Sequence, residues 1–579
     1  MRYSLIQEEI PFYTPVEQIF SNRGISVSEI EHYKNVSESD TYSPALFENI
    51  KEGVVLLISH IKKRSRVGIL VDVDADGFTS ASLLYNYLDR LFPSWASRNL
   101  IYYIHKNKQH GLSDVVEKII DSKVRLVIVP DAGGGDGAYA QQLKEAGIDT
   151  LILDHHYTTI EECAPAVVIN NQLGGYPNTT LSGVGVVYKF CQYIDNSLGI
   201  NQADDFLDLV AVGCVADLMP LTDYETLYYI RQGLTYINNP FIKAMLIEQA
   251  YSIEKHGGYD PFCIGFYIAP FINATIRVGT MEEKEMLFKA MLNRFGNELV
   301  PSGKRGHKGE MVPLAVEACR VCSNVKARQT KVRDENLEII ERLIEERNLI
   351  KDQMIVVQLE KELNMDKNIL GLIANILMEK YQRPILLLNE TEEEGQKAWA
   401  GSCRNYEYCE IEDLRSFIEK QPGVLWSSGH SNAFGSCVLD SHFDEFITTT
   451  NEQLAHLDFT PMYRVDAIFS ENSKAEYILD INSLKPYYGQ GFKEPYIAVD
   501  NIHVNTNNLQ LLSKDKNPTL KITLPNGVEL IKFKATEREY DELLNAVIEV
   551  VGKCDVNIWM ERITPQIKIE AYNIKHMDF

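Results

Sequence analysis

Continuous apolar runs that alternate with helical segments constrain the fold of this chain most. The run VGILVDV, at residues 67–73, is rich in β-branched residues and is typical of a strand buried on both faces. The same pattern predicts strands at 100–104, 125–129 and 150–153, and helices at 79–91, 113–120 and 139–146. This alternation predicts a doubly wound α/β domain with a parallel sheet, whose site lies at the carboxyl ends of the strands.

The whole chain divides by pattern into five segments, close to the number expected at ~150 residues per domain. They are an N-terminal extension packed on the first domain (1–50), the α/β domain (51–236), a helical connector that ends in an interdomain helix over 334–350 (237–350), a second α/β unit (351–450) and a mostly β domain (451–579). In the last segment, residues 519–533 alternate around Pro525-Asn526-Gly527, which is a hairpin signature.

Composition narrows the class of protein. The chain has 57 Lys and Arg, 81 Asp and Glu, a net charge of −24 and 45% hydrophobic residues, which excludes a disordered chain, a collagen and a small disulfide scaffold. Apolar runs fall short of ~18 residues, and the N-terminus lacks a basic segment followed by an apolar core, so we expect neither a membrane span nor a signal peptide. The ten scattered cysteines are typical of a reduced, cytoplasmic protein.

Two local features allow two interpretations each. Cys319 and Cys322 form a CxxC pair, which could be half of a zinc site, but the lack of a suitably spaced second pair favours two ordinary thiols. Residues 301–333 carry eight Lys and Arg against two Glu. This strip is either solvated surface or a surface that faces nucleic acid.

Acidic residues follow the predicted strands. Asp72, Asp74 and Asp76 come after the first strand, and they share one face if the strand continues to Gly77. Asp131 follows the strand at 125–129, and Asp154-His155-His156 ends the strand at 150–153. Asp217 lies in an otherwise apolar helical segment. Because strand ends converge on one crevice in a doubly wound sheet, we expect these side chains to meet there.

Such a cluster is suited to divalent cations. Three close carboxylates repel each other unless a cation lies among them. Carboxylates with imidazoles suit Mn²⁺ and carboxylates alone suit Mg²⁺, and two such ions ~3.5–4 Å apart promote attack on a phosphodiester. Each Asp alone could be a helix cap or a turn residue, and the run Ala132-Gly133-Gly134-Gly135 could be an anion-binding nest or a flexible turn. The joint pattern favours a metal site.

Short segments of the chain carry a family resemblance. The chain resembles the DHH phosphoesterase superfamily in its four motifs, which correspond in order to VDVDADG, VPDAGGGD, LDHH and VGCVADLMPL. The RecJ family of single-strand-specific 5′→3′ exonucleases is resembled further by LSGVGVVYKF, PFINATIRVG, GSCRN, SSGHSNAFG and LKPYYGQGFKEPYIAVDNIHV. The resemblance implies a DHH domain, a DHH-associated domain and a C-terminal oligonucleotide-binding (OB) barrel that grips DNA, with Lys521, Lys532 and Phe533 as candidates.

The resemblance also implies roles for single residues. Asp74, helped by Asp72, would bind a first metal ion, the set Asp76, His155 and Asp217 would bind a second, and Asp131 would bridge both. His156 would stabilise charge near the scissile phosphate. Many members of the family carry a histidine four residues before Asp74, where this chain has Leu70, which predicts a weaker first metal site. Candidate substrate-binding residues are Asn273, Arg277, Ser402, Arg404, Gly429 and His430, with Lys106 and Lys108 as phosphate contacts.

These implications define an expected function. The chain resembles a metal-dependent 5′→3′ exonuclease on single-stranded DNA that uses two Mn²⁺ or Mg²⁺ ions and releases 5′-mononucleotides. Alternatives are a DHH phosphodiesterase of short oligonucleotides or small nucleotides, and a non-catalytic single-strand-binding scaffold. The expected partners are single-stranded DNA and a single-strand-binding protein or helicase, and the expected state is a cytoplasmic monomer without membrane contact.

Overall fold

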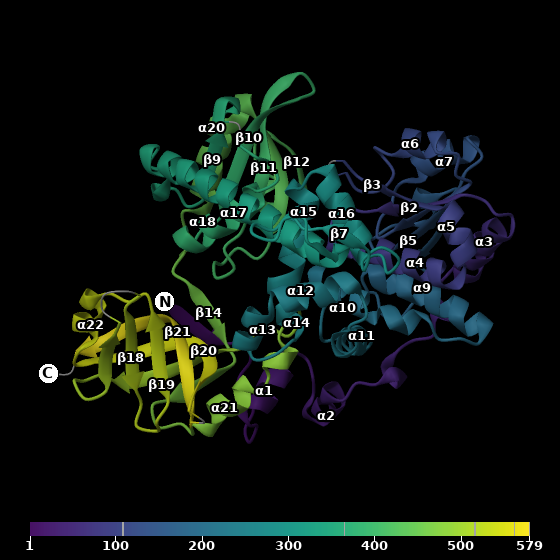
Figure 1. The fold of residues 1–579 in the computed structure, drawn as a ribbon. Coiled ribbons are helices and arrows are strands. Elements are labelled where there is room, and N and C mark those ends of the chain that lie inside the picture. Colours follow the sequence, from purple (N-terminus) through teal and green to yellow (C-terminus); the bar gives the residue numbers. More distant parts are fainter. Residues whose placement is uncertain (107–108, 364, 514–516, 561, 578–579) are drawn as a thin grey trace. The chain divides into compact units, whose positions relative to one another are not determined.

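The computed structural model describes residues 1–577, except 107–108, 364, 514–516 and 561 (Figure 1). The chain forms two compact units, each of which is described by itself. The first unit comprises residues 23–327 and 484–494, and the second unit comprises residues 1–22, 328–483 and 495–579.

A five-stranded parallel sheet lies at the centre of the first unit. Its strands are β2 (Val67–Val71), β3 (Leu100–Ile104), β4 (Leu126–Pro130), β5 (Asp149–Asp154) and β6 (Val167–Asn170), in the order β3-β2-β4-β5-β6. Strand order reverses beside β2, because β3 joins one side of it and β4 the other. The predicted doubly wound α/β fold is confirmed, with a topological switch point next to β2.

Helices cover both faces of this sheet. Contacts place α3 (Ile50–Lys62), α4 (Ala75–Leu91) and α9 (Gly183–Leu198) together, and α6 (Val116–Asp121) with α7 (Gly137–Glu145). Helix α4 begins four residues earlier than predicted, because the Asp74 carboxylate caps it by accepting from the Gly77 N–H at 3.0 Å. The condition under which Asp72, Asp74 and Asp76 share one strand face is therefore not met: β2 ends at Val71, and Asp76 lies in the first helical turn.

Helices dominate the connector, as predicted. They are α12 (Pro240–Glu248), α13 (Ala250–His256), α14 (Pro261–Cys263), a π-helical turn (Ile264–Ile268), α15 (Ala269–Val278) and α16 (Met281–Met291). They follow α10 (Leu207–Ala216) and α11 (Tyr224–Thr235) of the preceding segment. One stretch, Pro261–Val278, is long and apolar enough to cross a membrane by length and composition, although no such span was expected. Half of this stretch is buried inside the protein, and core helices of soluble proteins pass the same test.

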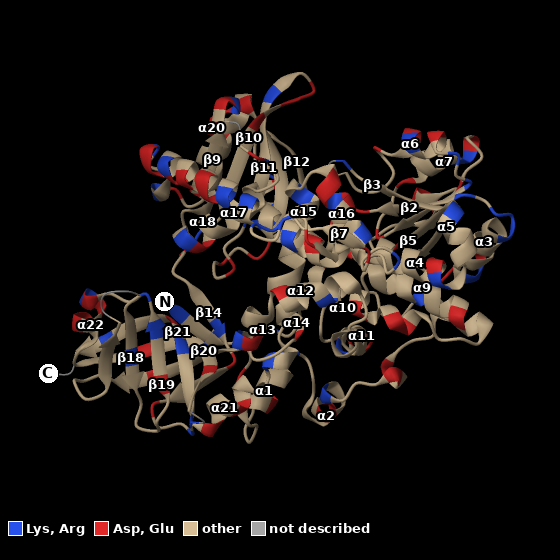
Figure 2. Ribbon diagram, viewed as in Figure 1, with Lys and Arg blue, Asp and Glu red and all other residues tan. Residues whose placement is uncertain are grey.

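The predicted interdomain helix is longer than its sequence pattern indicated. Helix α17 (Leu314–Glu346) has 33 residues and begins 20 residues before the predicted start, after the short pair β7 (Leu299–Pro301) and β8 (Met311–Pro313). Most of the basic strip therefore lies on a helix, where Arg320 pairs with Glu317 and Arg333 with Asp334. The charges of α17, coloured in Figure 2, are mainly basic up to Arg333 and mainly acidic from Asp334 to Glu346, so the positive strip is followed directly by negative charge on the same helix.

The second unit contains two larger sheets. The first has the order β12-β13-β11-β10-β9, from β9 (Ile355–Leu359), β10 (Ile385–Glu393), β11 (Gln396–Arg404), β12 (Val424–His430) and β13 (Ala433–Leu439). Only its β9–β10 pair is parallel. The sheet packs with α18 (Leu370–Tyr381), and its apolar core reaches α19 (Leu414–Ile418) and α20 (Phe443–Leu454). This is the predicted second α/β unit.

The other sheet has seven strands in the order β15-β16-β20-β21-β19-β18-β17. The strands are β15 (Ala467–Ser470), β16 (Tyr496–His503), β17 (Leu509–Leu512), β18 (Thr519–Thr523), β19 (Glu529–Phe533), β20 (Ala546–Trp559) and β21 (Arg562–Met577). The hairpin expected around Pro525-Asn526-Gly527 is β18–β19. Lys521 and Lys532 pair with Glu529 and Glu539, whereas Phe533 is exposed.

The N-terminal segment packs only in part as predicted. Strand β1 (Arg2–Leu5) pairs in parallel with β14 (Met462–Val465), so residues 1–22 belong to the second unit. Residues 23–49 belong to the first unit, as predicted, and the Tyr33 hydroxyl donates there to the Leu221 carbonyl at 3.0 Å. Strand β1 has four residues without a helical or amphipathic pattern, so no pattern in the sequence indicated this long-range pairing.

Candidate active site

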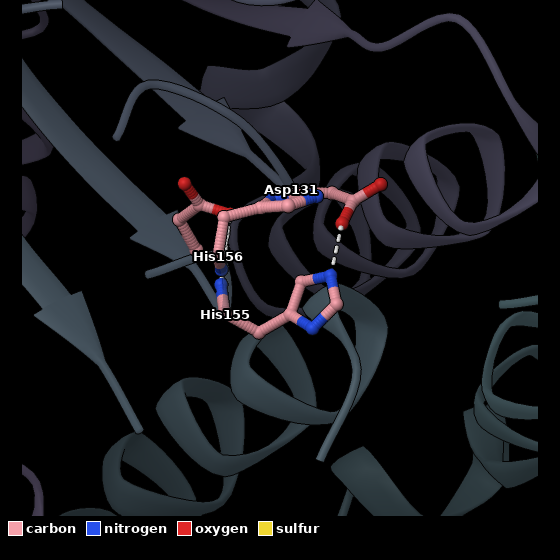
Figure 3. A group of neighbouring side chains, drawn as sticks. Asp131, His155 and His156 are labelled. Atoms are coloured by element: carbon pink, nitrogen blue, oxygen red, sulfur yellow. Dashed lines mark hydrogen bonds and ion pairs between the residues drawn. The ribbon is translucent and has the colours of Figure 1, made fainter. Parts of the chain in front are cut away.

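The predicted carboxylates and imidazoles of the first unit gather into overlapping groups. Asp72, Asp74 and Asp131 form one and Asp76, His155 and Asp217 form another, with the potential ligand atoms of each group within 4.8 Å of one another. A further group, Asp131, Asp154, His155 and His156, overlaps both. The His155 Nε2 atom lies 3.4 Å from Asp131 Oδ1 and 3.4 Å from Asp217 Oδ2. Asp131 therefore stands between the groups, and Figure 3 shows the His155 ring turned toward its carboxylate.

Each side chain is placed by the end of a secondary-structure element. Asp72 follows β2, Asp131 follows β4 and Asp154 ends β5, while Asp217 is the C-terminal cap of α10. Asp131 has a φ of 61°, in the left-handed region that residues other than glycine rarely adopt. A strained backbone of this kind persists only where the surrounding structure holds it, which is common in functional sites.

The N-terminus of α9 holds Asp76. Its carboxylate accepts hydrogen bonds from the Gly183 N–H at 2.7 Å, the Val184 N–H at 3.1 Å and the Ser182 hydroxyl at 3.3 Å. A Cβ on Gly183 would lie 2.2 Å from Asp131 Oδ1, so only glycine fits there. The sequence singled out this segment through LSGVGVVYKF but did not reveal that it supports both Asp76 and Asp131.

The electrostatics of the cluster favour bound cations. Burial and the neighbouring Asp74 raise the pKa of Asp76 to about 7, and burial and Asp76 raise the pKa of Asp217 to about 8. Burial, then Asp76, raises the pKa of Asp131 well above its ordinary value. Asp131 Oδ1 and His155 Nε2 are buried without a hydrogen-bond partner among the described residues. Unpartnered oxygen and nitrogen atoms among repelling carboxylates are what a divalent cation would satisfy.

Metal binding should therefore strengthen with pH. Asp76 and Asp217 must lose their protons to bind a cation, so the apparent Mn²⁺ affinity should rise steeply from pH 6 to about pH 9. Titration calorimetry in two buffers of different ionisation enthalpy should also detect protons released on binding. An Mn²⁺ affinity that stays constant over this range would contradict the assignment of these carboxylates as ligands.

The two histidines have opposite electrostatics. Burial lowers the pKa of His155 to about 4, which leaves it neutral and able to bind a metal ion. His156 donates from Nδ1 to Asp154 Oδ1 at 2.8 Å, and this hydrogen bond raises its pKa to about 9. Asp154, which alone could be a cap or a turn residue, is fully buried and also accepts from the Gly134 N–H at 3.0 Å. It thus orders both His156 and the glycine-rich turn.

Helix α15 brings two predicted substrate-binding residues to the carboxylates. The Asn273 side-chain oxygen accepts from the Ala75 N–H at 3.1 Å, so it contacts the start of α4. Burial raises the pKa of Asp74, and the positive charge of Arg277 lies near enough to oppose this rise. Lys106 is exposed, and its carbonyl accepts from Lys284 Nζ at 3.1 Å. Lys108 lies outside the described residues.

The other predicted substrate-binding residues meet on the second unit. In the β12-β13-β11 part of its sheet, Arg404 and His430 both lie opposite Ala433, from either side of β13. Ser402 lies opposite Gly435, and Gly429 precedes His430 at the end of β12. The side chains of Ser402 and Arg404 also approach the first turn of α18, where a Cβ on Gly371 would lie 2.7 Å from Arg404 Nη2. The sheet thus gathers a basic cluster from segments that are distant in sequence.

Parallel-strand ends that present carboxylates and imidazoles define a metal-dependent phosphoesterase class of site. Comparison with models of known protein families supports the same class of site. The model of the DHH family, N-terminal domain, matches residues 66–214, and the model of the RecJ OB domain matches residues 467–571.

Individual relatives match nearly the whole chain. It is 33% identical to a Bacillus subtilis (strain 168) protein that carries the assignment SPbeta prophage-derived single-strand DNA-specific exonuclease YorK, over 98% of this chain and 97% of that one. It is 25% identical to the single-stranded-DNA-specific exonuclease RecJ of B. subtilis, over 98% of this chain and 68% of the relative. The chain therefore belongs to the RecJ family of single-stranded-DNA-specific exonucleases.

Solved structures support the same fold. The crystal structure of Thermus thermophilus RecJ in complex with Mn²⁺ has a TM-score of 0.73 at 19% identity, covering 99% of this chain and 79% of that chain. The Mg²⁺ complex of the same protein has a TM-score of 0.66 at 18% identity, covering 99% of this chain and 78% of that chain.

Proposed function

We propose that this protein is a metal-dependent exonuclease that degrades single-stranded DNA from the 5′ end and releases 5′-mononucleotides. The observation that carries the proposal is the pair of ligand groups with Asp131 between them. Asp72, Asp74 and Asp131 would hold one divalent cation, and Asp76, His155, Asp217 and Asp131 a second. When bound, two Mn²⁺ or Mg²⁺ ions supply positive charge for the transition state of phosphodiester hydrolysis and lower the pKa of an attacking water.

The chain's own residues prepare the substrate for this chemistry. His156 is held by Asp154 as an imidazolium, and its remaining Nε2–H can donate to a phosphate oxygen and stabilise the charge that develops there. Arg277, near Asp74, can bind a neighbouring phosphate of the strand. The α9 N-terminus and Asn273 fix Asp76 and the start of α4, so that the carboxylates need not reorganise during the reaction.

We propose that the second unit binds the single-stranded DNA. We also propose that the five segments defined from the sequence are separate domains. The row of Arg404 and His430 offers positive charge and donors for a terminal phosphate. The C-terminal sheet disfavours a role on very short oligonucleotides, which need no extra binding domain. We further infer a cytoplasmic monomer, consistent with ten free cysteines, that receives single strands from a helicase or a single-strand-binding protein.

Labelled substrates test the direction of digestion. Single strands labelled at the 5′ or the 3′ end should both be degraded with Mn²⁺ or Mg²⁺, and the 5′ label should appear first as a mononucleotide. Release of the 3′ label first would contradict the proposed polarity. Long 5′-labelled strands that are bound but never cut, with either metal, would favour the non-catalytic scaffold.

Arg404 is the proposed reader of the 5′ phosphate. Arg404→Ala should weaken the binding of 5′-phosphorylated strands by about 10–100-fold, because a charge-assisted hydrogen bond is lost, and should affect 5′-hydroxyl strands less. Mn²⁺ binding should not change. Arg347→Ala is a matched control, since Arg347 pairs with Glu360 on the same unit. An equal loss for both kinds of strand would show that Arg404 does not read the end.

A further inference from the structure

His105 is a buried histidine beside the proposed metal cluster that no sequence motif singled out. It follows β3, which pairs in parallel with β2 so that Val71 lies opposite Ile104. The next residue of each strand brings His105 beside Asp72. His105 is 1% exposed, and its Nε2 atom lies 3.8 Å from Asp72 Oδ1.

The hydrogen bonding of His105 fixes its tautomer. Its Nδ1 atom lies 2.6 Å from Asp114 Oδ1. A carboxylate accepts, so Nδ1 carries a hydrogen, and in the neutral imidazole the lone pair resides on Nε2. This Nε2 atom is buried and has no hydrogen-bond partner among the described residues. Histidines that bind metal ions commonly have this arrangement, with one ring nitrogen donating to a carboxylate and the other directed at the ion.

Asp72 connects His105 to the cluster. It is 1% exposed and belongs to the group with Asp74 and Asp131. Its Oδ2 atom lies 2.6 Å from His110 Nδ1, and its Oδ1 atom, which faces His105, accepts among the described residues a long bond of 3.3 Å from the Gly111 N–H. A lone pair that faces a carboxylate oxygen is repulsive, and a proton on Nε2 or a divalent cation bound by both atoms removes this repulsion.

Strand β2 itself offers no imidazole to this group. Leu70 lies two residues before Asp72, but its side chain is fully buried in an apolar cluster with Tyr103, Leu112 and Ala132. A histidine at position 70 would place a polar ring among these side chains. The adjacent strand β3 is therefore the place from which an imidazole reaches the cluster.

We propose that His105 Nε2 is a ligand of the divalent cation bound by Asp72, Asp74 and Asp131, and that Asp114 orients the imidazole. This inference rests on the proposed two-cation site and adds a ligand to it. An imidazole favours Mn²⁺ over Mg²⁺, so His105 also sets a preference for Mn²⁺ at this position. The first metal site is then not weakened by the leucine at position 70.

Counting bound ions tests the proposal without an activity assay. The wild-type protein should bind two Mn²⁺ ions in titration calorimetry, and His105→Gln should retain one unchanged site while the other weakens by at least about 10-fold. Mg²⁺ binding should weaken less, so the ratio of Mn²⁺ to Mg²⁺ affinity should fall. A residue that only supports the fold would leave this ratio unchanged.

His60→Gln is the matched control. His60 is a buried histidine of the same unit whose Nε2 atom lies 3.1 Å from Asp149, at the opposite end of the sheet. It should bind two Mn²⁺ ions as the wild type does. Asp114→Asn provides a second test if His105→Gln fails to fold, because it keeps the imidazole but loses the orienting carboxylate, and it should weaken the same site by a smaller factor.

Three results would overturn the proposal. Two unchanged Mn²⁺ sites in folded His105→Gln would show that His105 is not a ligand. Loss of a site in His110→Gln but not in His105→Gln would move the ligand to the exposed histidine. An equal loss of Mn²⁺ and Mg²⁺ affinity would indicate a structural role. A wild-type protein that binds a single ion would instead contradict the two-cation function, so the two failures are distinguishable.

Discussion

Asp131→Asn is expected to abolish DNA hydrolysis while leaving a folded protein. Asp131 stands between the two ligand groups, and a neutral amide binds a divalent cation far more weakly than a carboxylate. Loss of several kcal/mol of charge stabilisation should lower the rate by at least about 10³-fold. Asparagine suits the φ of 61° at this position better than alanine does, so the backbone should be retained.

The same substitution should raise stability when metal is removed. The raised pKa of Asp131 means that the folded state holds its proton more tightly than the unfolded state does. Its contribution to stability is therefore present at low pH and is lost as pH rises through the folded-state pKa. With chelator at pH 8, the unfolding temperature of Asp131→Asn should exceed that of the wild type by a few degrees, and the difference should shrink at pH 5.

Thermal unfolding and nuclease assays of one preparation would check both effects. Asp149→Asn is the control, because Asp149 lies at the opposite end of β5 and pairs with Lys144 and His60. It should keep its activity and gain no stability. Activity close to wild type in folded Asp131→Asn, or lower stability than wild type in chelator at pH 8, would contradict the role given to Asp131.

The sequence predicted the parts of the fold that depend on local pattern. Buried parallel strands are recognisable in the sequence as β-branched apolar runs. Their alternation with helices is enough to place Asp131 and Asp154 at one sheet edge. The pairing of β1 with β14 spans most of the chain and involves four residues each, so periodicity cannot reveal it. The first 20 residues of helix α17 were not predicted as helix, because their basic composition is also typical of a surface loop.

The candidate metal ligands could be predicted from the sequence, but the contacts that surround and support them could not. Motifs named Asp74, Asp76 and His155, because carboxylates and imidazoles are recognisable as metal ligands in sequence. What supports them comes from other elements: the α9 N-terminus on Asp76, Asp154 beneath His156, and His105 from the neighbouring strand. These contacts depend on strand register and on which helix end meets the sheet, and a local sequence pattern reveals neither of them.

Gly183→Ala is expected to inactivate the enzyme although it changes no candidate ligand. Gly183 begins α9, its backbone is compatible with alanine, and alanine favours a helix more than glycine does. The added methyl group would lie 2.2 Å from Asp131 Oδ1 and 2.6 Å from its Cβ, so the carboxylate must shift. A displacement of about 1 Å at a catalytic group can cost about 10²-fold in rate.

The predicted result for Gly183→Ala is thus a folded protein with weaker Mn²⁺ binding and a rate lowered by about 100-fold or more. Gly265→Ala is the matched control, since a Cβ there would meet nothing closer than Val215 at 3.9 Å. Steady-state rates and Mn²⁺ titrations of both variants would separate steric displacement from a general effect of the extra methyl group. Full activity of Gly183→Ala would mean that Asp131 does not need the position it occupies against α9, and the two-cation arrangement would lose its geometric basis.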